Sequence, residues 1–393
     1  MLAKEPKRLL LGFLRGPIFL FVFLFIFSPR PGLAIESLAK QAYLMDMTTG
    51  AVLFEKNSDV PMSPASMSKM MTVYMLFDRL KDGSLALDDK FPVSEDAWRR
   101  GGAKSGGSTM FLEPGRKIRV EDLIRGIIVQ SGNDACIVVA EALASSEKAF
   151  GEEMTVRGKE MGLTNTVFKN STGWPDPGHL TTARDLAILA KRTIQDFPEY
   201  YHYYAEKEFT FNTIRQINRN PLLYRDIDAD GLKTGHTVDS GYGLTASATK
   251  GDRRLILVVN GLETKKDRRR EPDRLLAWGF REFNNYKLFS AGEEVMKADV
   301  WLGQEATVPL VIEKEMLLTL ARKARRKMKV TVKFENPIPA PIAKGQKVAK
   351  LILTAPGRDP LEVPLVAKNQ VKRLGLFGRL GTAIKAIILG ESE

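Results

Sequence analysis

The spacing of apolar and polar positions predicts strands at both ends of residues 35–285 and helices between them. Residues 41–46 and 51–56, joined by Thr-Thr-Gly, are typical of a hairpin. Helical spacing follows in five segments, at 66–80, 120–129, 133–145, 149–161 and 181–195. Three strand-like segments and a last helix complete the unit, at 231–237, 242–249, 254–260 and 271–283. This order predicts an α/β domain with a mainly antiparallel sheet flanked by helices.

The pattern changes after residue 285, where short strand-like runs alternate with Pro and Gly. These runs lie at 298–302, 307–312, 329–334, 347–355 and 361–367. They predict a small all-β domain over residues 286–368. The basic run at 321–329 is interpreted as a solvated strand and turn, and the Gly/Ser-rich stretch at 100–111 as a flexible loop.

The first 34 residues resemble a secretory signal peptide. A basic stretch ending at Arg15 precedes ten apolar residues at 18–27, and small residues lead to Ala34. Ten residues are too few to span about 30 Å of hydrocarbon as a helix. We therefore expect export and cleavage after Ala34, with an uncleaved anchor as the alternative.

The other end of the chain, residues 369–393, has the pattern of an amphipathic helix. Its apolar residues between Leu374 and Ile388 share one arc, and Lys372, Arg379 and Lys385 lie outside it. This arrangement is typical of a helix that lies in an anionic membrane surface. A terminal helix packed on its own domain is the alternative interpretation.

Composition and charge narrow the possible functions. With 44% apolar and 27% charged residues, the chain is globular rather than disordered, collagenous or coiled-coil. The net charge of +12 lies at the ends, because residues 35–285 carry 35 cations and 35 anions. The basic balance therefore does not indicate nucleic-acid binding. A single cysteine excludes an internal disulfide, and three histidines argue against a histidine-built metal centre.

Three short motifs carry the side chains suited to catalysis: S-M-S-K at 66–69, S-G-N at 131–133 and K-T-G at 233–235. Three residues apart on a helix, Ser66 and Lys69 share a face. A neutral lysine can activate a serine hydroxyl, and burial or neighbouring cations lower a lysine pKa far enough. Taken singly, each motif has an ordinary explanation: a helix cap, a turn between helices, and a strand with a surface lysine.

The remaining reactive side chains offer no competing site. His179 and His202 match no triad spacing and are interpreted as structural, so lysine becomes the expected base. Cys136, three positions after Asn133, is interpreted as a small packed residue, with thiol chemistry as a minor alternative.

In this order and spacing, the three motifs resemble the set that marks the penicillin-recognising serine enzymes. The segments PASMSKMMT, LIRGIIVQSGNDAC and DGLKTGHT are similar to low-molecular-mass penicillin-binding proteins that act as D-Ala-D-Ala carboxypeptidases. The resemblance runs from about residue 40 to 285 and, more loosely, to the C-terminus. It implies a β-lactamase/transpeptidase-like catalytic domain at 35–285, peptidoglycan pentapeptide as substrate, β-lactams as covalent inhibitors, and no cofactor. It also implies a location on the periplasmic side of the cytoplasmic membrane, with peripheral attachment through residues 369–393.

The resemblance further implies a role for each motif residue. Ser66 would be the acylated nucleophile and Lys69 the base for acylation. Ser131 and Lys233 would pass protons to the leaving D-alanine and help to activate water. Asn133 would orient the substrate amide and Lys69.

Substrate binding is assigned in the same way to the K-T-G strand and to two arginines. Thr234 and Gly235 would line the binding strand, and the backbone N–H groups of Ser66 and His236 would form the oxyanion hole. Arg219 and Arg254 match arginines near the pocket for the terminal carboxylate, with Arg253 as a competitor for Arg254.

Three other functions are compatible with the motifs. A DD-endopeptidase would use the same chemistry on cross-links. A β-lactamase would need rapid deacylation, for which Glu160 is the nearest glutamate in a poorly matching context. A catalytically idle cell-wall binding protein would need no intact motif. Oligomeric state stays open.

Overall fold

The computed structural model describes residues 35–376 and residue 378. The predicted export segment at 1–34, and residue 377 and residues 379–393 of the predicted terminal helix, lie outside the described residues. Among the helices in the described part, none has the length and apolar character needed to cross a membrane.

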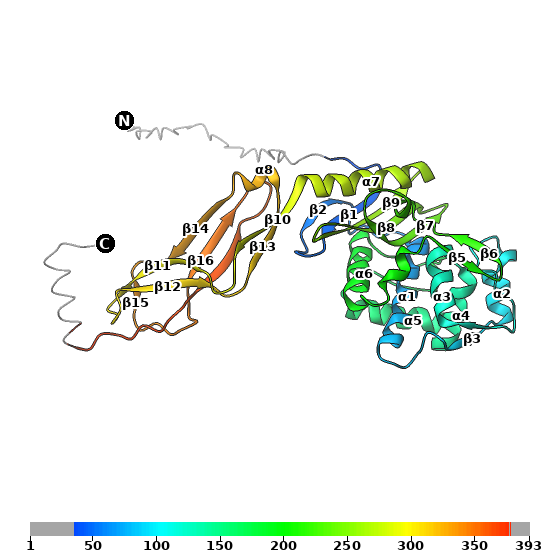
Figure 1. The fold of residues 1–393 in the computed structure, drawn as a ribbon, viewed down its shortest axis with the longest axis horizontal. Helices are drawn as coiled ribbons and strands as arrows, with labels where there is room; N and C mark the ends of the chain where they lie inside the picture. Colours follow the sequence, from blue (N-terminus) through cyan, green and yellow to red (C-terminus); the bar gives the residue numbers. More distant parts are fainter. Residues whose placement is uncertain (1–34, 377, 379–393) are drawn as a thin grey trace, which may run out of the picture. The chain divides into compact units, whose positions relative to one another are not determined.

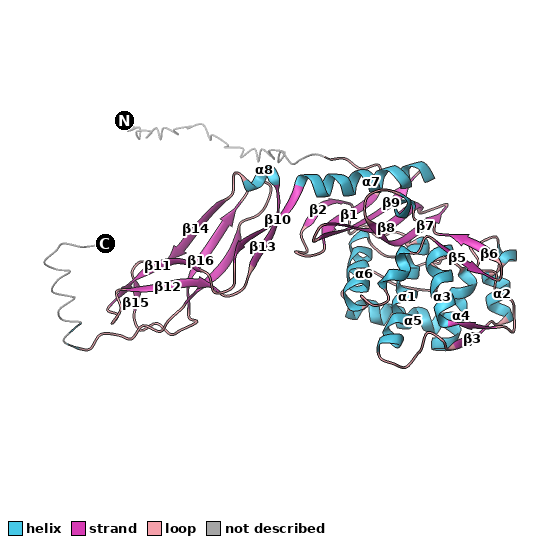
Figure 2. Ribbon diagram, in the orientation of Figure 1, coloured by secondary structure: helices cyan, strands magenta, loops and turns pink. Residues whose placement is uncertain are grey.

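A five-stranded antiparallel sheet forms the centre of the first domain (Figures 1 and 2). Its strands, in spatial order, are β2 (Val52–Lys56), β1 (Gln41–Asp46), β9 (Arg253–Leu262), β8 (Gly241–Lys250) and β7 (Ala229–Thr237). The predicted hairpin and the three predicted late strands are therefore confirmed. The pairing of β1 with β9 joins the beginning of the domain to its end.

Both faces of this sheet are covered, which explains the continuous apolar run of β9. Leu255 and Leu44 lie against Gly279 of helix α7, where a Cβ on the glycine would come within 3.0 Å of them. The neighbouring residues Tyr43 and Ile256 belong to the large apolar cluster on the other face. Successive strand residues point to opposite faces, so a strand buried on both sides is apolar at every position.

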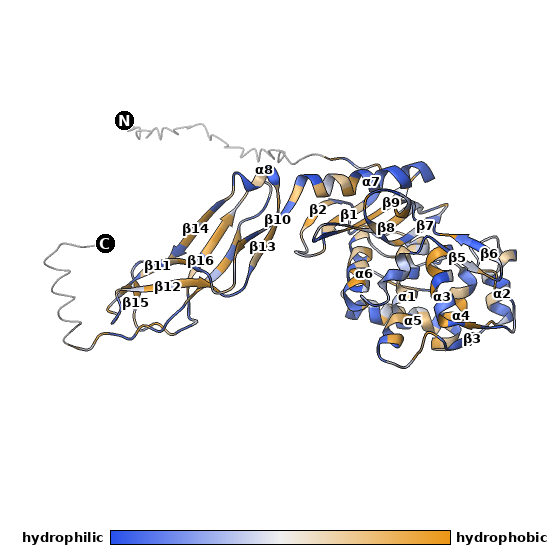
Figure 3. Cartoon of the chain, in the orientation of Figure 1, coloured by the Kyte–Doolittle hydropathy of each residue, from blue (hydrophilic) through white to orange (hydrophobic). Residues whose placement is uncertain are grey.

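The helices of this domain agree with the predicted positions and differ mainly at their ends. They are α1 (Lys69–Lys81), α2 (Glu95–Gly101), α3 (Val120–Arg125), α4 (Asn133–Ala144), α5 (Glu147–Glu160), α6 (Ala183–Asp196) and α7 (Lys265–Glu282). The residues of α1 from Lys69 to Phe77 are all buried, as expected for a helix surrounded by other elements. Helix α7 begins six residues before the predicted start. Its first turns are strongly polar (Figure 3), so they lack the apolar spacing on which the prediction depended.

Short elements connect these helices and strands. Single turns of helix occur at η1 (Ala65–Ser68), η2 (Ala103–Ser105), η3 (Gly126–Gln130), η4 (Tyr201–Ala205) and η5 (Pro221–Tyr224). Two small two-stranded sheets were not predicted, β3 (Lys90–Pro92) with β4 (Lys117–Arg119) and β5 (Glu208–Phe211) with β6 (Ile214–Ile217).

Residues 100–111 differ from the flexible loop that their composition suggested. The segment begins inside α2 and continues through η2. Its second half is anchored, because the backbone N–H of Asn133 donates to Ser108 O at 2.8 Å and that of Met110 donates to the Asp134 carboxylate at 2.8 Å. Glycine here serves close packing: a Cβ on Gly101 would lie 2.3 Å from the Asp134 nitrogen.

The second domain is all-β, as predicted, and has its own apolar cluster. Six strands form a sheet in the order β14 (Lys329–Phe334), β16 (Lys347–Thr354), β17 (Leu361–Ala367), β12 (Thr307–Ile312), β11 (Glu294–Trp301) and β15 (Ile338–Pro339). A separate pair joins β10 (Phe283–Phe289) to β13 (Met316–Ala321). The basic run at 321–329 includes one helical turn, α8 (Arg322–Arg325), where the sequence indicated strand and turn.

Residues 371–373 are extended, which corrects the start of the predicted terminal helix. Val371 forms an isolated bridge with Ile342 and is 1% exposed, and Arg373 forms one with Gly303. These residues complete the β domain, because their backbone hydrogen bonds and apolar contacts are made there.

Candidate active site

Ser66 lies on a tight turn at the entrance to α1. The turn η1 places Ala65 at a φ of +47°, a sparsely populated conformation for a residue with a Cβ. The Ser68 hydroxyl holds the turn by donating to Ala65 O at 3.0 Å. Ser66 is half-buried while Ala65 and Met67 on either side are buried, so its hydroxyl is the accessible group of the turn.

Lys69 is fully buried and contacts three oxygen atoms. Its Nζ lies 3.0 Å from Ser66 Oγ, 2.8 Å from Asn133 Oδ1 and 2.5 Å from Thr172 O. Burial lowers the pKa of Lys69 to about 8, because water no longer stabilises the ammonium form. A lysine in this state can lose its proton near neutral pH and accept one from a serine hydroxyl within hydrogen-bonding distance.

The S-G-N segment contributes a buried hydroxyl and a buried amide. Ser131 ends η3 in the left-handed conformation with φ +66°, and Asn133 begins α4. Ser131 Oγ is buried and has no hydrogen-bond partner among the described residues. A buried hydroxyl without a partner costs free energy, and such atoms mark sites where a ligand or water supplies the bond.

The K-T-G segment lies on β7, at the edge of the sheet. Lys233 is 3% exposed, and its Nζ donates to Thr234 O at 3.3 Å. Burial, together with the charges of Lys69 and Arg219, lowers the pKa of Lys233 well below its usual value. Two buried lysines that repel each other favour a state in which one of them is neutral.

Gly235 brings this strand against the turn that carries Ser66. A Cβ at Gly235 would lie 3.1 Å from both Ala65 Cβ and Pro64 O. The glycine therefore lets β7 pack closely on η1, a contact that the sequence did not indicate. The next residue, His236, stacks on Tyr242 at 4.0 Å between ring centroids.

The structure does not bring Arg254 to this group. Its Nη1 donates to Asp230 Oδ2 and to Ser247 Oγ, both at 2.6 Å. Arg253 is also occupied, by an ion pair with the buried Asp46 at 3.0 Å. The local sequence alone did not distinguish guanidinium groups that hold the fold from those at the site.

Arg219 and Arg268 are the arginines next to the K-T-G strand. Arg219 Nη1 donates to Ser108 Oγ at 2.5 Å, and Arg268 Nη1 donates to Gly235 O at 3.4 Å. The charges of both lower the pKa of Lys233. Neither forms an ion pair with a carboxylate in the described part of the chain. Sequence reasoning missed Arg268, which stands in the polar stretch K-K-D-R-R-R of α7.

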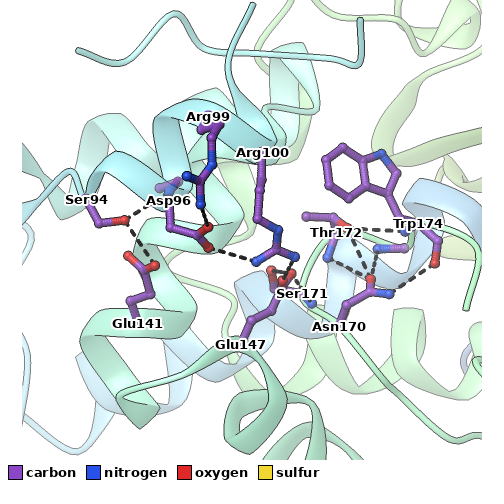
Figure 4. Close-up of polar contacts among 12 residues, drawn as sticks. Ser94, Asp96, Arg99, Arg100, Glu141, Glu147, Asn170, Ser171, Thr172 and Trp174 are labelled. Atoms are coloured by element: carbon purple, nitrogen blue, oxygen red, sulfur yellow. Dashed lines mark hydrogen bonds and ion pairs between the residues drawn. The ribbon is translucent and has the colours of Figure 1, made fainter. Parts of the chain in front are cut away.

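A second missed contributor is the loop at residues 170–174, whose polar contacts Figure 4 shows. Asn170 Oδ1 accepts hydrogen bonds from Thr172 Oγ1 at 3.1 Å and from the Gly173 backbone at 2.8 Å. Gly173 has a φ of +79° and leaves no room for a Cβ against Ala65 O. The Asn-x-x-Gly pattern is the signal of a tight turn, but it does not reveal what the turn contacts.

Two family profiles match the chain. The profile described as D-alanyl-D-alanine carboxypeptidase (peptidase S11) matches residues 29–264. The chain belongs to this family. The profile of the C-terminal domain of penicillin-binding protein 5 matches residues 283–373.

Curated relatives of this carboxypeptidase family cover nearly the whole chain. D-alanyl-D-alanine carboxypeptidase DacC of Escherichia coli is 41% identical over 381 residues, which are 96% of this chain and 95% of the relative. DacF of Bacillus subtilis is 36% identical, over 94% of this chain and 96% of the relative.

Solved structures of family members share the fold. Penicillin-binding protein 5 of Haemophilus influenzae is 38% identical with a TM-score of 0.74, covering 87% of this chain and 100% of that one. DacD of Francisella tularensis is 30% identical with a TM-score of 0.76, covering 86% of this chain and 95% of that one. The transpeptidase-like catalytic domain and the β domain expected from the sequence are thus confirmed.

Proposed function

We propose that this protein is a serine-type D-alanyl-D-alanine carboxypeptidase that removes the terminal D-alanine of peptidoglycan pentapeptides through an acyl-Ser66 intermediate. The observation that carries the proposal is the 3.0 Å contact between Ser66 Oγ and the buried Lys69 Nζ, in a chain of this family. In the described part of the chain no histidine side chain is hydrogen-bonded to Ser66, and Lys69 is the base within hydrogen-bonding distance.

In the first step, Ser66 Oγ attacks the carbonyl carbon of the penultimate D-alanine while Lys69 takes the hydroxyl proton. The backbone N–H groups of Ser66 and His236 stabilise the oxyanion. The C–N bond then breaks, and D-alanine leaves with a proton delivered through Ser131 and Lys233. Water hydrolyses the acyl ester in the second step, which restores the Ser66 hydroxyl and releases the shortened peptide.

The terminal carboxylate of the substrate is bound by the cations next to β7. Arg219, Arg268 and Lys233 interact electrostatically, and the two guanidinium groups have no carboxylate partner among the described residues. An anionic substrate group supplies that partner and reduces the mutual repulsion of the cations. Arg268 thus takes the role that the sequence suggested for Arg254.

The geometry argues against rapid hydrolysis of β-lactams by Glu160. This glutamate ends α5, is 56% exposed and pairs with Arg157 at 3.0 Å. In the described part of the chain, Glu160 forms no hydrogen bond with Ser66, Lys69 or Asn133, so its carboxylate has no contact that would place it against a water molecule at Ser66. β-Lactams should therefore acylate Ser66 and persist there.

We also propose that the enzyme works outside the cytoplasm, on the periplasmic side of the cytoplasmic membrane, and attaches through residues 377–393. Support comes from the signal-like pattern at 1–34 and from the apolar and basic arcs near the C-terminus.

The proposed reaction is tested by incubating the protein with penicillin and locating the adduct by peptide mapping and mass spectrometry. We expect a persistent adduct on Ser66 and D-alanine release from a Lys-D-Ala-D-Ala peptide, both abolished in Ser66→Ala. Ser63→Ala, at a neighbouring half-buried serine, is the matched control. D-Alanine release by a folded Ser66→Ala variant would refute the mechanism.

A further inference from the structure

The loop at 170–174 contacts helix α1 at two positions. Thr172 O accepts the hydrogen bond from Lys69 Nζ at 2.5 Å, and Ser171 O accepts one from Thr72 Oγ1 at 2.7 Å. Both acceptors are backbone carbonyls, so the position of Lys69 Nζ depends on where the loop backbone lies.

One carboxylate, that of Glu147, holds this loop from the outside (Figure 4). Its Oε1 accepts from the backbone N–H of Ser171 at 3.2 Å and from Ser171 Oγ at 2.7 Å. Glu147 is the first residue of α5, and its side chain is 10% exposed. At a more exposed glutamate, water would compete for these hydrogen bonds. The Glu147 side chain is largely shielded from water, so its bonds to Ser171 persist.

Arg100 fixes the other oxygen of the same carboxylate. Its Nη2 lies 2.6 Å from Glu147 Oε2, and its Nη1 lies 2.9 Å from Asp96 Oδ2. Helix α2 is thereby connected to Ser171 through Glu147. A carboxylate whose two oxygens both accept charge-assisted hydrogen bonds is held in one orientation, so the oxygen that faces Ser171 stays in place.

Glu147 also acts on Lys69 through its charge. Four charged or titratable groups act on the pKa of Lys69: Arg219 disfavours the ammonium form, whereas Cys136, Glu147 and Asp134 favour it. Asp134 is engaged by backbone N–H groups of the 109–112 segment, and burial raises the pKa of Cys136 to about 12, so the thiol is uncharged. Glu147 differs from Asp134 in that it also contacts Ser171, so its removal should change both the charge near Lys69 and the support of the 170–174 loop.

We propose that Glu147, clamped by Arg100, is a positioning residue that holds the Ser171–Thr172 backbone against Lys69 and supplies the negative charge that balances this base. The proposal rests on the function proposed above, because it assigns Glu147 a task in the activation of Ser66. Glu147 contacts neither Ser66 nor any reacting atom and acts through the loop.

Two substitutions separate its geometric and electrostatic contributions. Glu147→Gln keeps an oxygen for Ser171 but removes the charge, so Lys69 should lose its proton more easily. The acid limb of the pH profile of Ser66 acylation by a fluorescent penicillin should move about half a pH unit lower, with the maximal rate within about threefold of wild type. Glu147→Ala should show the same shift and a maximal rate about tenfold lower, because Ser171 is released.

Glu141→Gln is the matched control. Glu141 is also a half-buried helical glutamate, and it accepts from Ser94 Oγ at 3.0 Å without a contact to the 170–174 loop. Its pH profile should equal that of wild type. Melting temperatures of all variants report folding separately.

An unshifted acid limb in both Glu147 variants would overturn the proposal, whatever their melting temperatures, because a purely structural role lowers stability without moving the pH profile. Failure of the proposed function looks different. In that case wild type itself forms no adduct at Ser66.

Discussion

Lys69 is a lysine in surroundings that disfavour its charge but offer it three hydrogen-bond acceptors. It is fully buried, and Ser66 Oγ, Asn133 Oδ1 and Thr172 O surround its Nζ. Burial favours the neutral amine, while the acceptors hold the ammonium form in place when it appears. This balance suits the proposed role of Lys69, which is to take a proton from Ser66 and give it up again.

The pKa of Lys69 predicts the pH dependence of acylation. In the proposed mechanism the reacting form of Lys69 is the neutral amine, and its fraction grows as pH rises toward a pKa of about 8. Below that value the second-order rate constant for penicillin should fall about tenfold per pH unit, and above it the rate should level off. Stopped-flow acylation between pH 5.5 and 9.5 measures this.

Substitution of the same residue gives the control. Lys69→Arg should abolish acylation, because arginine stays protonated throughout this range. Retention of the wild-type rate by a folded Lys69→Arg variant would exclude Lys69 as the base.

At the scale of elements, the buried carboxylate of Asp134 joins α4 to the segment that precedes β4. It accepts from Thr109 Oγ1 at 2.7 Å and from the backbone N–H groups of Met110 and Leu112 at 2.8 and 3.0 Å. Asn133, its neighbour, contacts Lys69. Adjacent residues of α4 therefore make the two contacts: Asp134 holds the 109–112 segment, and the Asn133 amide contacts Lys69.

Asp134→Asn should destabilise the protein and slow acylation. The amide replaces one acceptor oxygen with a donor that faces other donors, and unsatisfied buried groups cost about 1–3 kcal/mol each. We expect a loss of about 3 kcal/mol in urea unfolding and a lower acylation rate. Asp88→Asn, at an 87% exposed ion-pair partner, should cost less than about 1 kcal/mol. Equal losses in the two variants would contradict this interpretation.

At the scale of the whole molecule, the described chain has two separate apolar clusters, one in each domain. The β domain ends beyond the boundary at residue 368 that the sequence suggested, because Val371 is buried in it and Gln304 N donates to Lys372 O at 2.8 Å. Residues up to Arg373 thus pack in the β domain, whereas the proposed membrane attachment belongs to the residues that follow, 377–393.

Two truncations of the mature chain distinguish these properties. A chain that ends at Leu376 should keep the full-length melting temperature but no longer sediment with vesicles containing anionic lipid. A chain that ends at Asn369 should also lose about 2 kcal/mol of stability, because Val371 is removed from the core. Continued sedimentation of the chain ending at Leu376 would refute attachment through residues 377–393.

The sequence by itself determined the main helices and strands of the catalytic domain, its antiparallel sheet and the residues of the three motifs. These features depend on the local pattern: Lys69 lies one turn after Ser66 on any helix, and the apolar run at 255–259 is typical of a buried strand. The expected boundaries were less exact where polar residues extend an element, as at the start of α7.

Only the tertiary structure decided which distant groups meet the motifs. Arg268 reaches Gly235, Thr172 O reaches Lys69, and Glu147 reaches Ser171, and no local pattern in the sequence indicates these partners. Arg253 and Arg254 show the converse, because long-range partners turn similar arginines into structural ion pairs. Periodicity records which way a side chain points within its own element, whereas the partner it meets depends on how elements pack.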